Sequence, residues 1–502
     1  MQISSRTGDL GQFPSRAIVV FVFEGSMTPL GAAADVDRAL DGAISQLLRE
    51  GAVKGKANEI TPIHTLGRIP SPWVLLVGLG KVEKSNAQAL RNAVAVAARY
   101  LRRLGADTVA TTADDALGLE PGVCAQAIVE GAMLGLYTFT VHKKEAEDEK
   151  EVREIVFVEA EPARAEAVGR GAEQGRVLAE ATNWARDLAN EPANYMTPSD
   201  LAERAQAVAR EYNLGCRVFE RKELEDMGMG AFLGVAQGSH QPPKLIVLDY
   251  KGDVPGATPL GLVGKGITFD TGGISIKPSQ GMEEMKSDMA GGAEVIAAVR
   301  ALAELKAKVN VTAVVPATEN MPGGSAMRPG DTVRAMNGKT IEVVNTDAEG
   351  RLILADALCY ARSLGLSPVV DVATLTGAIQ ITLGKVAIGA MTNDEALLER
   401  VKGAGDAAGE RVWQLPLFDE YKELLDSEVA DMKNVGGREA GSITAALFLR
   451  EFIEDTPWVH LDIAGVDQRD EVKGIFLKGS SGTGVRTLIN LALSLAERPF
   501  SG

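Results

Sequence analysis

The sequence predicts a two-domain α/β protein, with a smaller N-terminal α/β domain and a larger C-terminal α/β domain built on a mixed, largely parallel sheet. First, the chain has 502 residues, whereas single hydrophobic cores stop growing at ~250–300 residues. Second, hydrophobic residues make up 45% and charged residues 24% of the chain, which is the balance of a globular protein. Third, apolar segments rich in β-branched residues alternate with helical patterns, the order typical of α/β proteins.

The N-terminal part shows this alternation from residue 16 onward. Strands are predicted at 17–23, 73–77 and 154–158, and a helix at 86–104. The string VGLGK at 77–81 follows a predicted strand but lacks the further glycine of a dinucleotide-binding fingerprint, so a structural turn is preferred over nucleotide binding. The mixed charge run at 142–151 predicts a solvated segment without a function of its own.

A long Ala- and Glu-rich stretch without proline at 164–188 predicts a helix that joins the two domains. Residues 1–165 therefore form the predicted N-terminal domain, for which oligomerisation or regulation is the expected role, 166–190 the linker helix, and 191–502 the larger domain. Thr197 or Ser199 is placed to cap the helix that follows the linker. The larger domain then continues with strands at 244–248, 260–263, 309–315, 369–373 and 458–463, and with helices at 291–305 and 352–364.

Composition restricts the classes of function. The formal net charge of −16 disfavours nonspecific binding to nucleic acid or acidic membranes and favours small or neutral substrates. No apolar run approaches the ~18–20 residues of a membrane-spanning helix, and the first residues do not resemble an export signal. The three cysteines lack the spacing of a disulfide framework or a structural zinc site. We therefore expect a reducing, cytoplasmic location.

Three charged residues that are candidates for a functional site follow a predicted buried strand. The segment VGKGITFDTGGISIKP (263–278) places Lys265, Asp270 and Lys277 among glycines at the carboxyl side of that strand, the edge at which open α/β sheets bind ligands. The next segment, MKSDMAGG (285–292), places Asp288 at the start of a predicted helix. Taken alone, Asp288 is interpreted as a helix N-cap, since Asp is favoured there.

A second acidic segment, NTDAEGRL (345–352), changes that interpretation. In an extended segment residues two apart share a face, so Asp347, Glu349 and Arg351 are expected on one side, before the helix begins. A surface ion pair or an acidic first helical turn remains the alternative for this segment by itself.

Four carboxylates gathered at strand ends would repel one another and raise their own pKa values unless cations lay between them. The sequence therefore predicts a site for divalent metal ions. Oxygen ligands suit Mg²⁺ and Mn²⁺ as well as Zn²⁺, and a nitrogen donor favours zinc and its neighbours. The four histidines are scattered without an HExxH motif, which favours structural roles for His64, His142, His240 and His460.

These segments together resemble the leucyl aminopeptidase (cytosol aminopeptidase) family, of bacterial type. GKGITFDTGGISIKP, MKSDMAGGA, NTDAEGRL, HLDIAG (460–465) and GTGVR (482–486) occur in the family's order. The resemblance covers roughly residues 175–495, and NTDAEGRL is highly specific. It implies a catalytic metallopeptidase domain at 191–502 that carries a two-metal site.

The resemblance also implies roles for individual residues. Asp270 and Glu349 would bridge two divalent ions, zinc or manganese with magnesium as a further option. Asp347 would complete one metal site, and Lys265 with Asp288 would complete the other. The remaining two positions, Lys277 and Arg351, would be catalytic without binding metal.

The implied activity is hydrolysis of the N-terminal peptide bond of peptides. A water activated between two metals would be the nucleophile, one metal would take the substrate's free α-amine, Lys277 would stabilise the oxyanion, and Arg351 would hold a bicarbonate that shuttles the proton. Met285, Thr374 and Gly377 match family positions that line the pocket for the first side chain, so leucine-like residues are the expected substrates. The alternative for Met285 is an ordinary core residue. The family also forms homohexamers, two trimers face to face, which we expect here.

Two other functions compete with this hypothesis. A DNA-binding or architectural role, in addition to or instead of peptidase activity, is known in the family, but the acidic net charge argues against it. Hydrolysis of phosphate esters is the second alternative, because the clustered lysines and Arg351 would suit a phosphate group.

Overall fold

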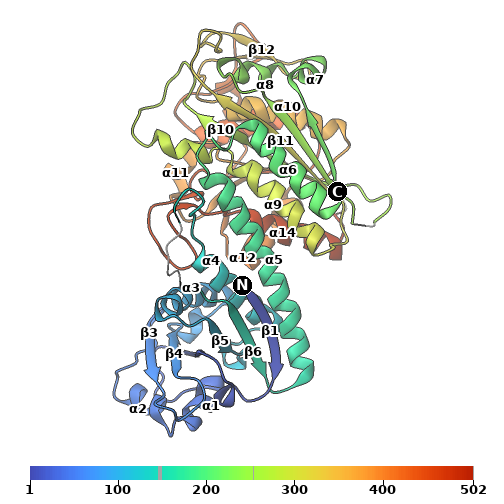
Figure 1. Cartoon of the computed structure of the whole chain (residues 1–502). Coiled ribbons are helices and arrows are strands. Elements are labelled where there is room, and N and C mark those ends of the chain that lie inside the picture. Colours follow the sequence, from blue (N-terminus) through green and yellow to red (C-terminus); the bar gives the residue numbers. More distant parts are fainter. Residues whose placement is uncertain (145–149, 253, 501–502) are drawn as a thin grey trace. The chain divides into compact units, whose positions relative to one another are not determined.

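The computed structural model describes residues 1–144, 150–252 and 254–500. Five residues of the predicted solvated charge run, 145–149, lie outside this part of the chain. The chain divides into two compact units: unit 1 comprises 1–180 and 470–477, and unit 2 comprises 181–469 and 478–502. Each unit has its own α/β sheet (Figure 1), which confirms the predicted two-domain α/β class.

Unit 1 is built on a six-stranded sheet in the order β1-β6-β5-β2-β4-β3. All neighbouring strands are parallel except β3 and β4. The strands are β1 (Gln2–Thr7), β2 (Ala17–Val22), β3 (Ile60–His64), β4 (Trp73–Gly78), β5 (Thr108–Thr111) and β6 (Glu154–Glu159). The helices are α1 (Gly31–Ala39), α2 (Ala43–Arg49), α3 (Ala87–Leu104) and α4 (Pro121–Leu136), with short 3₁₀ turns η1 (Leu10–Gln12), η2 (Val82–Lys84) and η3 (Asp115–Leu117).

The central strand β2 is apolar throughout because helices cover both faces of the sheet. Its odd-numbered residues, such as Val19 and Phe21, pack in one core with residues of α3 and α4. Its even-numbered residues, such as Ile18 and Val20, pack in a second core with residues of α1 and α2. Alternation of side chains along a strand produces this two-sided burial.

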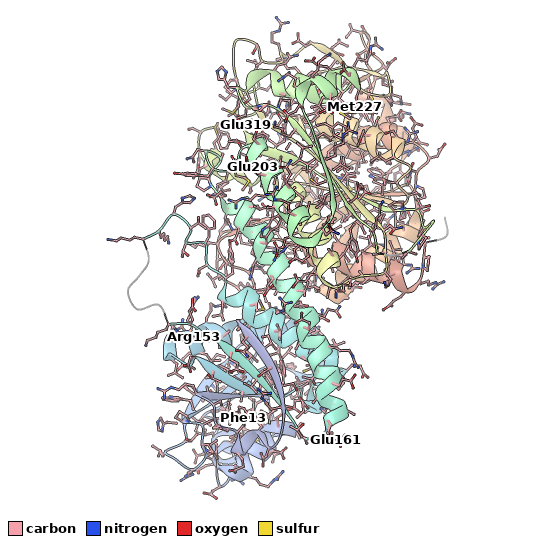
Figure 2. The ribbon with its side chains drawn as sticks, turned by 45° about the vertical axis from the view of Figure 1, so that its right-hand side comes forward. Phe13, Arg153, Glu161, Glu203, Met227 and Glu319 are labelled. Atoms are coloured by element: carbon pink, nitrogen blue, oxygen red, sulfur yellow. The ribbon has the colours of Figure 1, made fainter. Side chains whose placement is uncertain are left out.

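Helix α5 (Pro162–Asn190) begins before the predicted linker helix at 166–190 and ends at the same residue, and the division between the units falls within it. Figure 2 labels Glu161 directly before its first turn. The next helix, α6 (Pro198–Tyr212), starts at Thr197, whose side chain accepts a hydrogen bond from the Asp200 backbone N–H while the Asp200 carboxylate accepts one from the Thr197 N–H. This reciprocal capping box confirms Thr197 as the helix cap.

Unit 2 is built on a nine-stranded mixed sheet in the order β16-β15-β18-β14-β9-β11-β8-β7, with β10 paired to β11. The pairs β18-β14, β14-β9, β9-β11, β10-β11 and β15-β16 are parallel, and the other three are antiparallel. The strands are β7 (Gly215–Phe219), β8 (Lys244–Tyr250), β9 (Leu260–Gly264), β10 (Gly266–Asp270), β11 (Val311–Asn320), β14 (Val369–Ala373), β15 (Ile388–Thr392), β16 (Val412–Gln414) and β18 (Trp458–Asp462). Smaller sheets join β12 (Thr332–Arg334), β13 (Thr340–Glu342) and β17 (Met432–Lys433), and β19 (Gln468–Arg469) with β20 (Gly479–Ser480).

Helices cover both faces of this sheet as well. Helices α6 and α9 contact β8 and β11 and lie against one face, whereas α10 contacts β9, β11, α8 and α13 on the other (Figure 1). The helices of unit 2 after α6 are α7 (Arg221–Asp226), α8 (Gly230–Val235), α9 (Ala290–Glu304), α10 (Gly350–Ser363), α11 (Gly377–Leu383), α12 (Glu395–Ala408), α13 (Gly441–Ile453) and α14 (Val485–Glu497). The 3₁₀ turns are η4 (Ala236–Gly238), η5 (Met282–Ser287) and η6 (Asp419–Leu425).

The thiols of Cys124, Cys216 and Cys359 are all free. Within the described residues, no helix combines the length and the apolar character that crossing a membrane requires.

Candidate active site

The predicted site residues meet at the carboxyl ends of adjacent parallel strands in unit 2. Strands β18, β14 and β9 are parallel neighbours, and β10 runs parallel to the last part of β11. Lys265 follows β9, Asp270 ends β10, and Thr374 follows β14. The sheet therefore collects at one edge the groups that the sequence places tens of residues apart.

Lys265 is almost fully enclosed, with 3% of its side chain exposed. Its Nζ lies 2.8 Å from Asp288 Oδ1 and 2.9 Å from Glu349 Oε1, and it donates a hydrogen bond of 3.0 Å to the Thr374 carbonyl. Burial would lower the pKa of Lys265, but the surrounding carboxylates outweigh burial and hold the pKa above its usual range. Lys265 thus ties two acidic segments to one strand end.

Gly350 makes this close approach possible. A Cβ atom at residue 350 would lie 2.6 Å from Lys265 Cε, a distance that no side chain tolerates. The glycine of NTDAEGRL is therefore required where α10 begins beside the lysine.

Lys277 lies on the loop after β10 and contacts a second pair of carboxylates. Its Nζ is 2.8 Å from Asp270 Oδ2 and also pairs with Asp347 Oδ1. The loop turns back through Gly272, whose φ of +85° is readily adopted only by glycine. Burial opposes the charge of Lys277, but Asp270, Glu349 and Asp347 together hold its pKa above the usual range.

The carboxylates form a compact cluster that fits divalent metal ions. One oxygen atom from each of Asp270, Asp347 and Glu349 lies within 4.8 Å of the others. Burial, reinforced by Asp270 and Asp288, raises the pKa of Glu349 to about 8, and burial raises that of Asp288 to about 6. Concentrated buried acids of this kind need a cation to remain ionised, and carboxylate oxygens suit Mg²⁺, Mn²⁺ and Zn²⁺.

Asn320 belongs to the site although the sequence analysis did not predict it. Its Nδ2 donates to Asp270 Oδ1 at 2.8 Å and to Glu349 Oε2 at 3.4 Å. It ends β11, beside Asp270 at the end of β10. A polar residue after the apolar run of 311–317 is the same signal that identifies Asp270, but the predicted strand stopped at residue 315.

Arg351 is buried, and burial lowers its pKa to about 10. Its Nη1 donates to the Asn434 carbonyl at 2.7 Å, while its Nε has no hydrogen-bond partner among the described residues. The Nε–H of the guanidinium is thus left to donate to a bound ligand.

A cavity of about 240 Å³ opens onto the cluster. Its walls include all the predicted metal ligands, Lys277 and the predicted substrate residues Met285, Thr374 and Gly377, but not Arg351. Several further wall residues were not among the predicted site residues. They lie in η5, in the loops after β14 and β18, in α11 and in β19: Ser287, Leu375, Thr376, Gln380, Ala464, Asp467 and Gln468. Ser287 and Ala464 lie within the segments MKSDMAGG and HLDIAG but are small neutral residues, and no motif marks the other positions.

One local expectation is wrong, and the alternative interpretation of Asp288 as a helix cap does not hold. The segment around Asp347 is a turn rather than extended, and Arg351 lies inside the first turn of α10, because Glu349 already has helical dihedral angles (φ −74°, ψ −35°). Asp288 does not cap α9: it follows η5, and its Oδ1 instead accepts hydrogen bonds from Lys265 and from the Thr374 hydroxyl at 2.7 Å. In both cases hydrogen bonds and ion pairs to distant segments override the local pattern.

The histidine on β18, His460, is fully buried. Its Nδ1 is 2.6 Å from Asp371 Oδ1, and Asp371 Oδ2 accepts a bond of 2.6 Å from Trp458 Nε1. None of the histidines contributes to the carboxylate cluster of the described chain.

Comparison with known families agrees with this geometry. Residues 183–489 match the model for the cytosol aminopeptidase family, catalytic domain, and residues 19–146 match the model for its N-terminal domain. The fold and the acidic site at its strand ends define a metal-dependent hydrolase. The chain belongs to the cytosol aminopeptidase family and is a metal-dependent aminopeptidase that acts on peptides.

Curated relatives and solved structures extend over almost the whole chain. "Probable cytosol aminopeptidase" of Solibacter usitatus is 49% identical and covers 98% of this chain and 99% of its own. The protein of the same name from Alkaliphilus metalliredigens is 47% identical, with 92% and 93% covered. A mutant of tomato leucine aminopeptidase superposes with a TM-score of 0.87 at 33% sequence identity, covering 98% of this chain and 96% of its own. The bottromycin maturation enzyme BotP in complex with Mn superposes with a TM-score of 0.84 at 35% identity, covering 96% of this chain and 100% of its own.

Proposed function

We propose that the cluster holds two divalent metal ions, with Asp270 and Glu349 shared between them. Asp347 would complete one site, and Lys265 with Asp288 the other. The observation that carries this assignment is the convergence of four carboxylates on two lysines within hydrogen-bond distance at one sheet edge. Zinc and manganese both suit mixed oxygen and nitrogen ligands, and a related structure is described in complex with Mn.

Two bound divalent ions would lower the pKa of water toward ~7 and polarise the scissile carbonyl. The chain's own contribution begins with Lys277, which the neighbouring carboxylates keep protonated. Its ammonium is less enclosed than that of Lys265, with 22% against 3% of the side chain exposed, so it can face the oxyanion. Removing such a donor typically costs ~10²–10³ in rate.

Arg351 would hold a bicarbonate ion that moves the proton from water to the leaving amine. Its buried guanidinium keeps Nε free of partners within the described residues, and its fork suits a planar carboxylate-like anion. Arg351 does not line the cavity, whereas Glu349, two residues before it in the sequence, does.

The first side chain of the peptide would enter between Met285, Thr374 and Gly377. All three line the cavity, and the flexible Met285 favours apolar groups. We therefore propose a preference for leucine-like first residues. A homohexamer and a cytoplasmic location complete the proposal, both from likeness to the family.

Metal analysis combined with a leucyl-anilide assay tests this function. Purified protein should contain two divalent ions per chain, chelation should abolish hydrolysis, and Mn²⁺ or Zn²⁺ should restore it. A phosphate monoester assayed in parallel should not be hydrolysed. Full activity of metal-free protein, or faster hydrolysis of the phosphoester, would contradict the proposal.

A further inference from the structure

Strand β18 ends in a buried carboxylate to which none of the preceding roles applies. Asp462 is 1% exposed, and its Oδ1 accepts backbone N–H bonds from Leu375 at 3.2 Å, Thr376 at 3.4 Å and Ala464 at 3.2 Å. Its Oδ2 accepts a bond of 2.6 Å from Thr376 Oγ1. One carboxylate therefore holds two separate stretches of backbone, the loop at 374–377 and the turn at 464.

Both stretches form walls of the cavity. Thr374, Leu375, Thr376 and Gly377 line it from one loop, and Ala464 lines it from the other. Because one carboxylate accepts hydrogen bonds from both loops, through Oδ1, the separation of these walls depends on Asp462.

The loop at 374–377 also contacts the acidic cluster. The Thr374 carbonyl accepts a bond of 3.0 Å from Lys265 Nζ, and the Thr374 hydroxyl donates one of 2.7 Å to Asp288 Oδ1. Asp462 accepts hydrogen bonds from the next two residues of this loop, Leu375 and Thr376. The backbone at 374–376 thus connects the carboxylate on β18 with Lys265 and Asp288.

Thr376 is the second member of this arrangement. Its Oγ1 accepts the Ile379 N–H at 3.2 Å, which caps α11, and lies 2.7 Å from Ser442 Oγ. The start of α11, including Gly377, is therefore fixed by the same hydroxyl that binds Asp462.

We propose that Asp462, acting through Thr376, is a positioning residue that sets the width of the pocket for the peptide's first side chain. This inference rests on the proposed function, because it takes the cavity as the peptide site. Charged acceptors make stronger hydrogen bonds than neutral ones, and the carboxylate is fully enclosed, so the two walls have little freedom to separate. Discrimination between first residues that differ in size then depends on a residue that does not contact the substrate.

The test measures kcat/KM for leucyl-anilide and alanyl-anilide in the metal-loaded full chain and takes their ratio. Because both values come from the same preparation, the ratio does not depend on the fraction of folded or metal-loaded enzyme. Small differences in side-chain size are worth ~10–200-fold in an apolar pocket. Asp462→Ala and Thr376→Val should each lower the leucine-to-alanine ratio by about fivefold or more.

Three further variants sharpen the result. Thr376→Ser keeps the hydroxyl and should restore the ratio, whereas the double variant should fall no further than Asp462→Ala, since both single changes break the same contact. Thr382→Val makes the same substitution on the exposed face of α11 and should leave the ratio unchanged. If Asp462→Ala does not fold, Thr376→Val still probes the contact.

An unchanged ratio in both Asp462→Ala and Thr376→Val would overturn the assignment even if their activity fell. A metal-loaded wild-type chain that hydrolyses neither anilide would instead overturn the proposed function, and with it this inference. The two failures are therefore distinguished by the wild-type assay.

Discussion

At the scale of single residues, the two lysines of the site differ in their environment, and we propose different roles for them. Lys265 lies between Asp288 and Glu349 with 3% of its side chain exposed. Lys277 faces Asp270 and Asp347 with 22% exposed. A lysine that binds metal must lose its proton, which only a directly coordinated cation can drive against neighbouring carboxylates. A lysine that stabilises an oxyanion must keep its proton.

We therefore expect Lys265→Ala to lose metal and Lys277→Ala to lose turnover. Metal retention by wild-type protein should fall as pH falls, because the carboxylates hold the proton of Lys265 tightly and that proton competes with the metal. Lys277→Ala should keep both ions while kcat drops ~10²–10³-fold. The measurements are metal content after dialysis across a pH series, and kcat for each variant. Loss of metal from Lys277→Ala, with both ions and normal turnover in Lys265→Ala, would reverse the assignment.

The sequence predicted the charged residues of the site better than the neutral ones. Asp270 and Lys265 stand out because charge is rare after a buried strand. Asn320 and Thr376 do not, because Asn and Thr are common at strand ends and helix caps for purely structural reasons. Asp462 lies within the quoted HLDIAG motif, but its role depends on which loops it contacts, and those contacts exist only in the folded chain.

At the scale of elements, helix α10 carries both the chemistry and much of the packing of unit 2. Its first turn contributes Arg351 next to Glu349, and its middle is buried on every side. The sequence predicted this helix at 352–364, but it begins at Gly350. Local propensity favours a start after the glycine, whereas the helix includes Gly350, where a Cβ atom would lie 2.6 Å from Lys265 Cε.

Asp356, in the middle of α10, gives a stability prediction for this element. Its two oxygens accept N–H bonds from Phe232 at 2.8 Å and Met336 at 2.7 Å, and burial raises its pKa to about 7. Asp356→Ala would leave both N–H groups without acceptors, at about 1–3 kcal/mol each. Asp356→Asn keeps one acceptor and should lose about half as much.

Urea unfolding followed by fluorescence measures these changes as shifts in midpoint at constant slope. The control is Ser363→Ala in the exposed last turn of α10, which should change stability by less than about 0.5 kcal/mol. Equal midpoints for Asp356→Ala and wild type would show that the two N–H groups find other acceptors, and that Asp356 does not anchor α10.

At the scale of the whole molecule, the class of both domains was predictable from the alternation of apolar and helical segments, but the membership of the short segment 470–477 in unit 1 was not. In the sequence this segment lies between two parts of unit 2, although it packs as part of unit 1. No local sequence pattern indicates this membership. Assembly is a further property at this scale.

The surface of unit 2 favours the assembly of several chains. Several large apolar side chains of unit 2 are exposed in the single chain, including Ile381 at 86%, Trp413 at 64%, Phe418 at 60% and Val429 at 69%. Exposed apolar groups on this scale favour contact with another protein surface. Together with the homohexamer that likeness to the family implies, this leads us to expect about six times the chain mass of 53.0 kDa in light scattering. Because apolar contacts are not screened by salt and each chain carries a net charge of −16, added salt should preserve or strengthen the hexamer. A fully active monomer at micromolar concentration, or dissociation on adding salt, would contradict a hexamer held by apolar contacts.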